Sequence, residues 1–207
     1  MPTDALHTTL VHAFISSRID YCNAVLYGAA DAVIRRLQAV LHAAARLITG
    51  VQWNDHITPT LRDTLHSVHW LPVSQRITFK IALMTYNCIH GWSPVYFRDI
   101  CSPIVSVPFR SRLRFADNDD MIVPRSRTAR YGPRSFHVAA PQIWNMLPPH
   151  LKNSSVSREQ FKLSLKTWLF VQAWRLWELC LSGALQILDL IDWLIDSACQ
   201  TSCSNNC

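Results

Sequence analysis

The sequence predicts a mainly α-helical protein with an arginine-rich loop or short β-hairpin near residues 104–125. Apolar residues recur at intervals of three and four along most of the chain, which is the spacing of one helix face. Capping residues and glycines mark the ends of several of these segments. The apolar share of 49% suffices for a packed core, and the charged share of 16% is too low for wholesale disorder.

Two helices are predicted before residue 51. Residues 4–27 follow helical spacing, and Gly28 is a plausible stop. The next helix runs between Asp31, a candidate N-cap, and Gly50, a candidate C-terminal glycine. Its apolar stripe consists of Ile34, Leu37, Leu41, Ala44 and Ile48. The arginines that lie largely off this stripe are Arg35, Arg36 and Arg46.

Three more helices are predicted as far as residue 101. A capping residue followed by proline opens a helix over 59–68 and a short helix over 94–101. Between them, Pro72 breaks the pattern and a helix starts at Ser74, with Gly91 beyond its end.

The stretch 102–134 differs, because its four prolines argue against helix. Arg110, Arg112 and Arg114 alternate with other residues at strand spacing, and residues 121–123 could pair with them. We therefore expect a loop or hairpin here.

Two helices are predicted over 135–170. The first covers 135–146 and is interrupted at Pro141. The second follows a capping box made by Ser157 and Gln160. Its predicted apolar face consists of Phe161, Leu165 and Trp168.

Residues 171–207 have a different character. A tryptophan and leucine stripe can lie along one face of a helix over Trp174–Leu194, which needs a partner protein, a membrane surface or the body of the protein to cover it. A polar tail with three cysteines follows. The longest weakly charged apolar run, 179–188, is too short to span a bilayer, so we expect no transmembrane segment.

Charge suggests a polyanionic partner. The net charge is +6, but residues 171–207 carry −3 and residues 1–170 therefore carry +9. Nucleic acid, RNA or DNA, is the commonest partner of such a body, and a basic protein without a specific partner is the alternative. Cys22, Cys88 and Cys101 lie far apart among apolar residues, which fits reduced, buried thiols. With no visible signal peptide, we expect an intracellular protein, nuclear or cytoplasmic.

No enzymatic chemistry is predicted, and we expect no catalytic residue, metal or cofactor. The string FADNDD over 115–120 suggests a polymerase metal site, but Asn118 separates the acids, and solvated loop acids are the preferred interpretation. Scattered histidines and the cysteines of the tail lack zinc-site spacing. No glycine-rich phosphate loop or nucleophile motif is present.

An arginine cluster is the strongest functional candidate. Guanidinium groups bind phosphates, and neighbouring aromatic rings can stack on unpaired bases. The alternative is a solvated basic loop that pairs with the nearby aspartates. The cluster consists of Arg110, Arg112, Arg114, Arg125, Arg127, Arg130 and Arg134.

An ordered series of motifs runs from residue 17 to residue 170: SRIDYCNAVLYG, LQAVLHAAARLITG, DHITP, HWLPVSQRITFK, VPRSR, FHVAAPQIWNMLP and FKLSLKTWLF. Together they resemble the region behind the polymerase core of a non-LTR retrotransposon (LINE-type, jockey-like) reverse transcriptase, an RNA-directed DNA polymerase. The resemblance implies a thumb-like helical region and a C-terminal extension that hold template and primer. It makes Arg35, Arg36, Arg46, Arg125 and Arg127 candidate contacts to the nucleic-acid backbone. It implies packing roles for Trp70, Leu71, Pro72, Trp144 and Leu147.

The resemblance divides the chain into four parts. Residues 1–101 correspond to the thumb-like region, 102–134 to the arginine-rich loop and 135–170 to C-terminal helices, whereas 171–207 match no part of the family. The catalytic aspartates of the palm lie outside the resemblance, so we expect a non-catalytic fragment. The alternatives are a helical protein-interaction module and a translated transposon relic without a selected function.

Overall fold

The computed structural model describes residues 2–50, 70–97, 100–104, 119–129, 131–153 and 155–173. The described chain is mainly α-helical, as predicted, and contains no β-strand. It divides into two compact units, Met1–Leu169 and Phe170–Cys207. Four parts of the predictions lie outside the described residues: the helix at 59–68, the pairing of Arg110, Arg112 and Arg114, the helix Trp174–Leu194 and the cysteine tail. No described helix is both long and apolar enough to cross a bilayer.

The first helix ends earlier than predicted. Helix α1 (Pro2–Val11) continues through a π-helical turn (His12–Ser16) into α2 (Ser17–Asp20). The chain then turns at Cys22, whose φ of 52° is left-handed, and enters a 3₁₀ turn over Asn23–Leu26. Helical spacing continues beyond Asp20, but the ion pair of Asp20 with Arg76, a residue 56 positions away, fixes the end of the helix.

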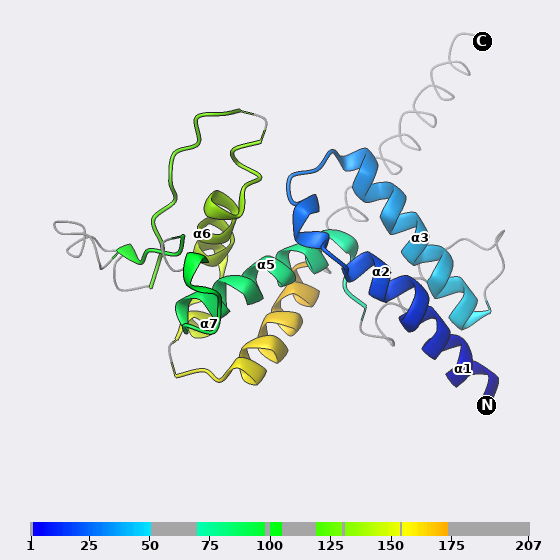
Figure 1. Ribbon diagram of the computed structural model, residues 1–207. Coiled ribbons are helices and arrows are strands. Elements are labelled where there is room, and N and C mark those ends of the chain that lie inside the picture. The colour runs from blue at the N-terminus through cyan, green and yellow to red at the C-terminus, as the bar shows by residue number, and fades with distance from the viewer. Residues whose placement is uncertain are drawn as a thin grey trace, which may run out of the picture. The chain divides into compact units, whose positions relative to one another are not determined.

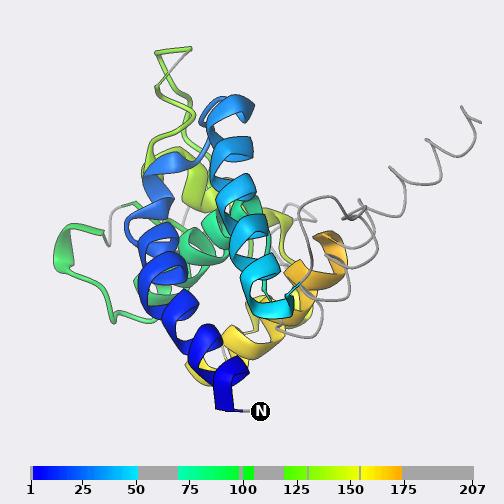
Figure 2. The same cartoon turned by 90° about the vertical axis from the view of Figure 1, so that its right-hand side faces the viewer.

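Helix α3 (Asp31–Thr49) lies beside α1 and the π-helical turn, and the pair can be followed in Figures 1 and 2. Asp31 is not the N-cap. Ala30 occupies the N-cap position and has no capping side chain. Asp31 places its negative charge in the first turn of the helix. Gly50 ends the helix as predicted, with a φ of 69° that favours glycine.

Helix α5 (Val73–Ile89) contacts α2, α3 and α6, so it is the element around which the others pack. It starts one residue before the predicted Ser74. Its first amide is satisfied from α3, because Val73 N donates to Gln38 Oε1 at 2.9 Å. Trp70 and Leu71, which precede the helix, are buried as the sequence predicted, and Pro72 is half-buried.

The segment after α5 forms less helix than predicted. Residues 94–97 contain a 3₁₀ turn, Val95–Phe97, in place of the start of an α-helix. Phe97 packs edge-on against Phe136, with 5.3 Å between ring centroids. This contact with a distant residue holds the turn where local capping signals alone favoured a helix.

Helix α6 (Phe136–Met146) is continuous through Pro141, contrary to the predicted interruption, and α7 (Pro149–Lys152) follows. Proline removes one backbone hydrogen bond and usually breaks a helix. Here the turns on both sides of Pro141 are buried against α5, with Ala140 and Trp144 almost inaccessible to solvent. This packing keeps the helix intact.

A capping box opens the next helix, over residues 158–173, as predicted. Gln160 N donates to Ser157 Oγ at 3.3 Å, and Ser157 N donates to Gln160 Oε1 at 3.2 Å. Phe161 and Leu165 are fully buried, as expected. The third predicted position is wrong by one residue, because Leu169 is buried and Trp168 is only half-buried.

Three aromatic rings form the centre of the core. Tyr86 of α5 stacks on Phe161 with 4.3 Å between centroids, and Trp144 of α6 lies 6.1 Å from Phe161 on a nearly parallel plane. All three are at most 2% exposed. The Tyr86 hydroxyl also donates to the carbonyl of Val156 at 2.5 Å, so the stack ties three helices together and satisfies its own polar group.

The segment 119–122 is clamped onto α6 and α7. Among the described residues, Met121 forms a single antiparallel bridge with Pro103. Asn145 holds both the amide and the carbonyl of Met121, at 2.8 and 2.9 Å. Asp120 pairs with the buried Lys152 at 2.6 Å. The expectation of solvated loop acids is therefore wrong for Asp120.

Two of the predicted buried thiols lie together, whereas Cys22 is exposed. A hydrogen bond from Cys101 lowers the pKa of Cys88 to about 7, although burial acts in the opposite direction. The same contact raises the pKa of Cys101. Cys101 is therefore the protonated donor of the pair.

Replacing Lys152 by methionine is expected to lower the free energy of unfolding by about 3 kcal/mol, because it leaves the Asp120 carboxylate without its cation. Urea denaturation measures this. The double change Asp120→Asn with Lys152→Met is expected to recover most of the loss. Lys162→Met, which removes an exposed pair with Glu159, serves as the control. Equal losses in the single and double variants would contradict the interpretation.

The pKa of His42 is lowered by burial and, secondarily, by the charge of Arg46. Gln38 Nε2 lies 2.7 Å from His42 Nε2 and, with Oε1 occupied by Val73, must donate to a neutral ring. The unfolded chain thus takes up a proton at higher pH than the folded chain. Stability from this group is present above about pH 6.5 and is lost as the pH falls below that value.

His42→Gln is therefore expected to flatten the fall in unfolding free energy between about pH 7 and pH 5. Urea denaturation at several pH values measures the slope. The same change at the exposed His7 is the control and leaves the slope as in the unaltered chain. An unchanged slope in His42→Gln would contradict the buried neutral ring.

Candidate nucleic-acid interface

Six of the ten candidate arginines lie in the described part of the chain. Arg35, Arg36, Arg125 and Arg127 are exposed, and Arg46 and Arg134 are half-buried. The remaining four candidates lie outside the described residues: Arg110, Arg112, Arg114 and Arg130. The described candidates come from two segments more than 75 residues apart in sequence, so the first question is whether the fold brings these segments together.

Arg134 joins the two segments. Its Nε donates to the carbonyl of Tyr27 at 3.1 Å, across 107 residues of sequence. Its aliphatic stem lies on Gly28, where a β-carbon would approach Arg134 Cγ to 2.8 Å, and Gly28 has a φ of 64°. Glycine is required there for both reasons. Arg134 is therefore engaged in holding the loop to the turn that precedes α3.

The loop that ends at Arg134 folds tightly on itself. Ser126 Oγ donates to the carbonyl of Thr128 at 2.9 Å. A β-carbon at Gly132 would overlap the Ser126 side chain and lie 2.7 Å from the Thr128 carbonyl oxygen. Only glycine fits this close approach. The folded loop leaves the side chains of Arg125 and Arg127 in solvent.

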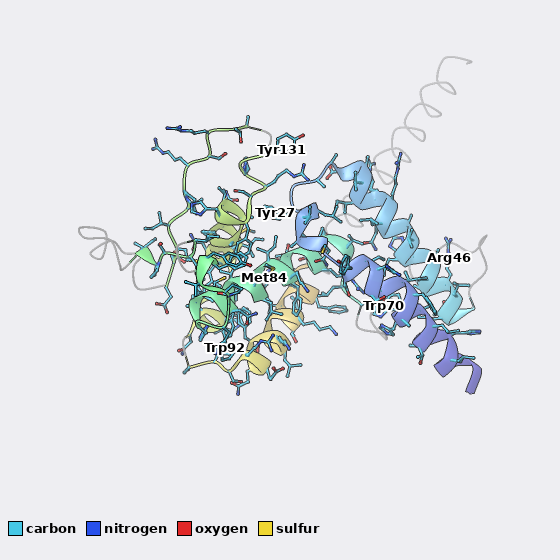
Figure 3. The ribbon with its side chains drawn as sticks, in the orientation of Figure 1. Tyr27, Arg46, Trp70, Met84, Trp92 and Tyr131 are labelled. Atoms are coloured by element: carbon cyan, nitrogen blue, oxygen red, sulfur yellow. The ribbon has the colours of Figure 1, made fainter. Side chains whose placement is uncertain are left out.

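The docked loop lies at the beginning of α3. Tyr27 is four residues before Asp31, and Arg35 and Arg36 follow within the first two turns of the helix. Figure 3 shows Tyr27 and Tyr131 near this end of α3 and Arg46 near the other end. Arg46 is eleven residues after Arg35, which is about 16 Å along a helix axis. The fold thus groups Arg35 and Arg36 with the arginine loop and leaves Arg46 apart.

This basic surface is positively charged. We define it as Arg35, Arg36, Arg125, Arg127 and Arg134. Burial raises the pKa of Tyr27, so its phenol stays neutral and does not offset the arginine charge. Arg134 also lies 6.0 Å from the ring of Tyr131, an exposed aromatic side chain. Guanidinium groups can bind a phosphate backbone, and an exposed ring can stack on an unpaired base.

No metal site accompanies this surface in the described ranges, where no group of three histidine, cysteine, aspartate or glutamate side chains could hold an ion. His90, one of the histidines considered from the sequence, instead donates from Nδ1 to the carbonyl of Tyr86 at 2.9 Å and stacks on its ring. Its environment is that of a packing residue.

Sequence patterns missed a pocket elsewhere in the unit Met1–Leu169. It has a volume of about 430 Å³ and is lined by residues that include His12, Asp20, Arg76, Lys80 and Lys166. These residues come from the π-helical turn, α2, α5 and the helix over 158–173, and no single motif contains them all. The only sequence signal for the pocket is that Lys80 and Lys166 each lie opposite the apolar face of their helix.

Comparison with protein-family models, with curated proteins and with solved structures found no match to the chain.

Arg134→Ala is expected to release the arginine loop from the turn before α3. Amide hydrogen exchange over residues 122–134 should accelerate about tenfold, because one charged hydrogen bond to the Tyr27 carbonyl is lost. Hydrogen-exchange mass spectrometry measures this. Arg18→Ala, at an exposed position of α2, is the control. Unchanged exchange would show that other contacts hold the loop.

Proposed function

We propose that this chain is a non-catalytic nucleic-acid-binding region, similar to the part of a non-LTR retrotransposon reverse transcriptase that follows the polymerase core. In the parent protein it would help to hold template and primer. One observation carries the proposal: Arg134 docks an arginine-bearing loop beside the start of α3, so that two basic segments distant in sequence form one surface.

The exposure of the surface supports this function. Arg35, Arg36, Arg125 and Arg127 project into solvent and have no ion-pair partner among the described residues. Arginines that served the fold would be engaged in the way that Arg76 is with Asp20. Arg134 in addition lies 6.0 Å from the exposed ring of Tyr131. Exposed guanidinium groups together with an exposed aromatic ring can bind single-stranded nucleic acid.

The predicted arginine segment adds to the same proposal. Residues 105–118, which lie outside the described residues, carry Arg110, Arg112 and Arg114. We propose that these three arginines extend the basic surface as a loop or short hairpin. Backbone contacts of this kind bind without reading sequence, so affinity should depend on salt and little on base composition.

Binding of a fluorescein-labelled single-stranded RNA, followed by anisotropy, tests the proposal. The logarithm of the binding constant should fall linearly with the logarithm of salt concentration. Arg35→Ala with Arg36→Ala should make the slope shallower by about 1.4, since each phosphate contact to a single strand contributes about 0.7.

The control removes the same charge elsewhere. Arg18→Ala with Lys162→Ala removes one exposed and one half-buried cation outside the surface and should leave the slope nearly unchanged. Binding that does not depend on salt, or no binding at low salt, would overturn the proposed function.

A further inference from the structure

The pocket of about 430 Å³ lies where the π-helical turn and α2 meet α5 and the helix over 158–173. None of its lining residues belongs to the basic surface. It therefore carries an inference that goes beyond the proposed function. Its volume is within the range of about 300 to 1,000 Å³ that is typical of small-molecule sites.

The charge of the pocket selects an anion. Its one carboxylate, Asp20, is neutralised by Arg76, whose Nη1 lies 3.0 and 2.9 Å from the two carboxylate oxygens. The Nε of Arg76 is also occupied, because it donates to the Leu71 carbonyl at 2.8 Å. Lys80 and Lys166 remain, both exposed and without an ion pair to any described residue. Two free ammonium groups at one pocket match a phosphate.

One wall of the pocket is aromatic. Trp70 packs edge-on against His12, with 5.3 Å between centroids and 82° between planes. The Arg76 guanidinium lies 5.8 Å from the centre of the Trp70 ring. Phe79 and Leu83 of α5 continue the apolar lining. This wall suits a flat, partly apolar ring more than a fully hydrated sugar or an extended chain.

Two buried polar lining residues have atoms without a hydrogen-bond partner. Ser16 and Asn23 are 5% and 2% exposed, and Ser16 Oγ and Asn23 Oδ1 have no hydrogen-bond partner in the described part of the chain. A buried polar atom without a partner is costly, and native proteins rarely leave one unexplained. A ligand edge with hydrogen-bond donors would satisfy both residues.

We infer that the pocket binds a mononucleotide, with its phosphate at Lys80 and Lys166 and its base against the aromatic wall. The three requirements, an anion, a flat ring and a polar ring edge, meet in a nucleotide, whereas inorganic phosphate fulfils only the first and a nucleoside only the other two. The lining residues specify a phosphate and a base in the ligand, and they do not specify its sugar.

Isothermal titration calorimetry of the 207-residue chain with AMP and UMP tests this inference, with inorganic phosphate, adenosine and uridine as partial ligands. At least one mononucleotide should bind about tenfold or more tightly than either phosphate or its own nucleoside, since both parts contribute contacts. Lys80→Met and Lys166→Met should each weaken that mononucleotide about tenfold.

Lys162→Met is the matched control, because Lys162 lies on the same helix one turn before Lys166 and pairs with Glu159 outside the pocket. It should leave mononucleotide affinity unchanged, as should the pair Arg35→Ala and Arg36→Ala. The variant with Arg35→Ala and Arg36→Ala alters the basic surface but not the pocket, so each proposal can fail without the other.

Three results would overturn the inference. No heat of binding with either mononucleotide at millimolar concentration would exclude the site. Equal affinities for mononucleotide and inorganic phosphate would reduce it to an anion site without a base. A loss in Lys162→Met as large as in Lys166→Met would show that general charge, and not the pocket, is responsible.

Discussion

The stack of Tyr86, Phe161 and Trp144 is the interaction on which the rest of the structure depends. Each ring comes from a different helix, and burial of such large apolar surfaces is the main favourable contribution to folding. It fixes α6 and the helix over 158–173 on α5. The position of α6 in turn determines where the segment with Met121 is held, because Trp144 also donates its indole N–H to the Asp119 carbonyl at 3.0 Å.

Both candidate sites are built at the margins of this core by long-range polar contacts. Arg134 reaches Tyr27 and thereby attaches a loop to the α3 side of the molecule. Arg76 reaches Asp20 and closes one side of the mononucleotide pocket. In each case one arginine is used for assembly, which leaves other cations at the surface available to a ligand. In both proposals, the engaged arginines hold the fold and the unengaged cations are the ones expected to contact a ligand.

The sequence located much of the candidate surface but could not rank its members. Clustering of arginine pointed to Arg125 and Arg127, and the resemblance to a reverse-transcriptase region pointed to these two and to Arg35 and Arg36. The fold leaves all four exposed. Neither distinguished Arg134, whose role depends on a carbonyl 107 residues away. Lys80 and Lys166 lie within two of the quoted motifs but were not predicted as site residues. The pocket that both line exists only when α5 and the helix over 158–173 pack together.

The sequence by itself determined the helical class, the limits of α3 and α5 to within one residue, and the capping box at Ser157, because these features depend on contacts within one or two helical turns. Only the tertiary structure decided where the first helix ends, that α6 runs through Pro141, and that Asp120 is paired with a buried lysine. Local propensities differ by less than about 1 kcal/mol for most residues, whereas burial and ion pairing across the fold contribute several times more. Where the two conflict, the distant contact prevails.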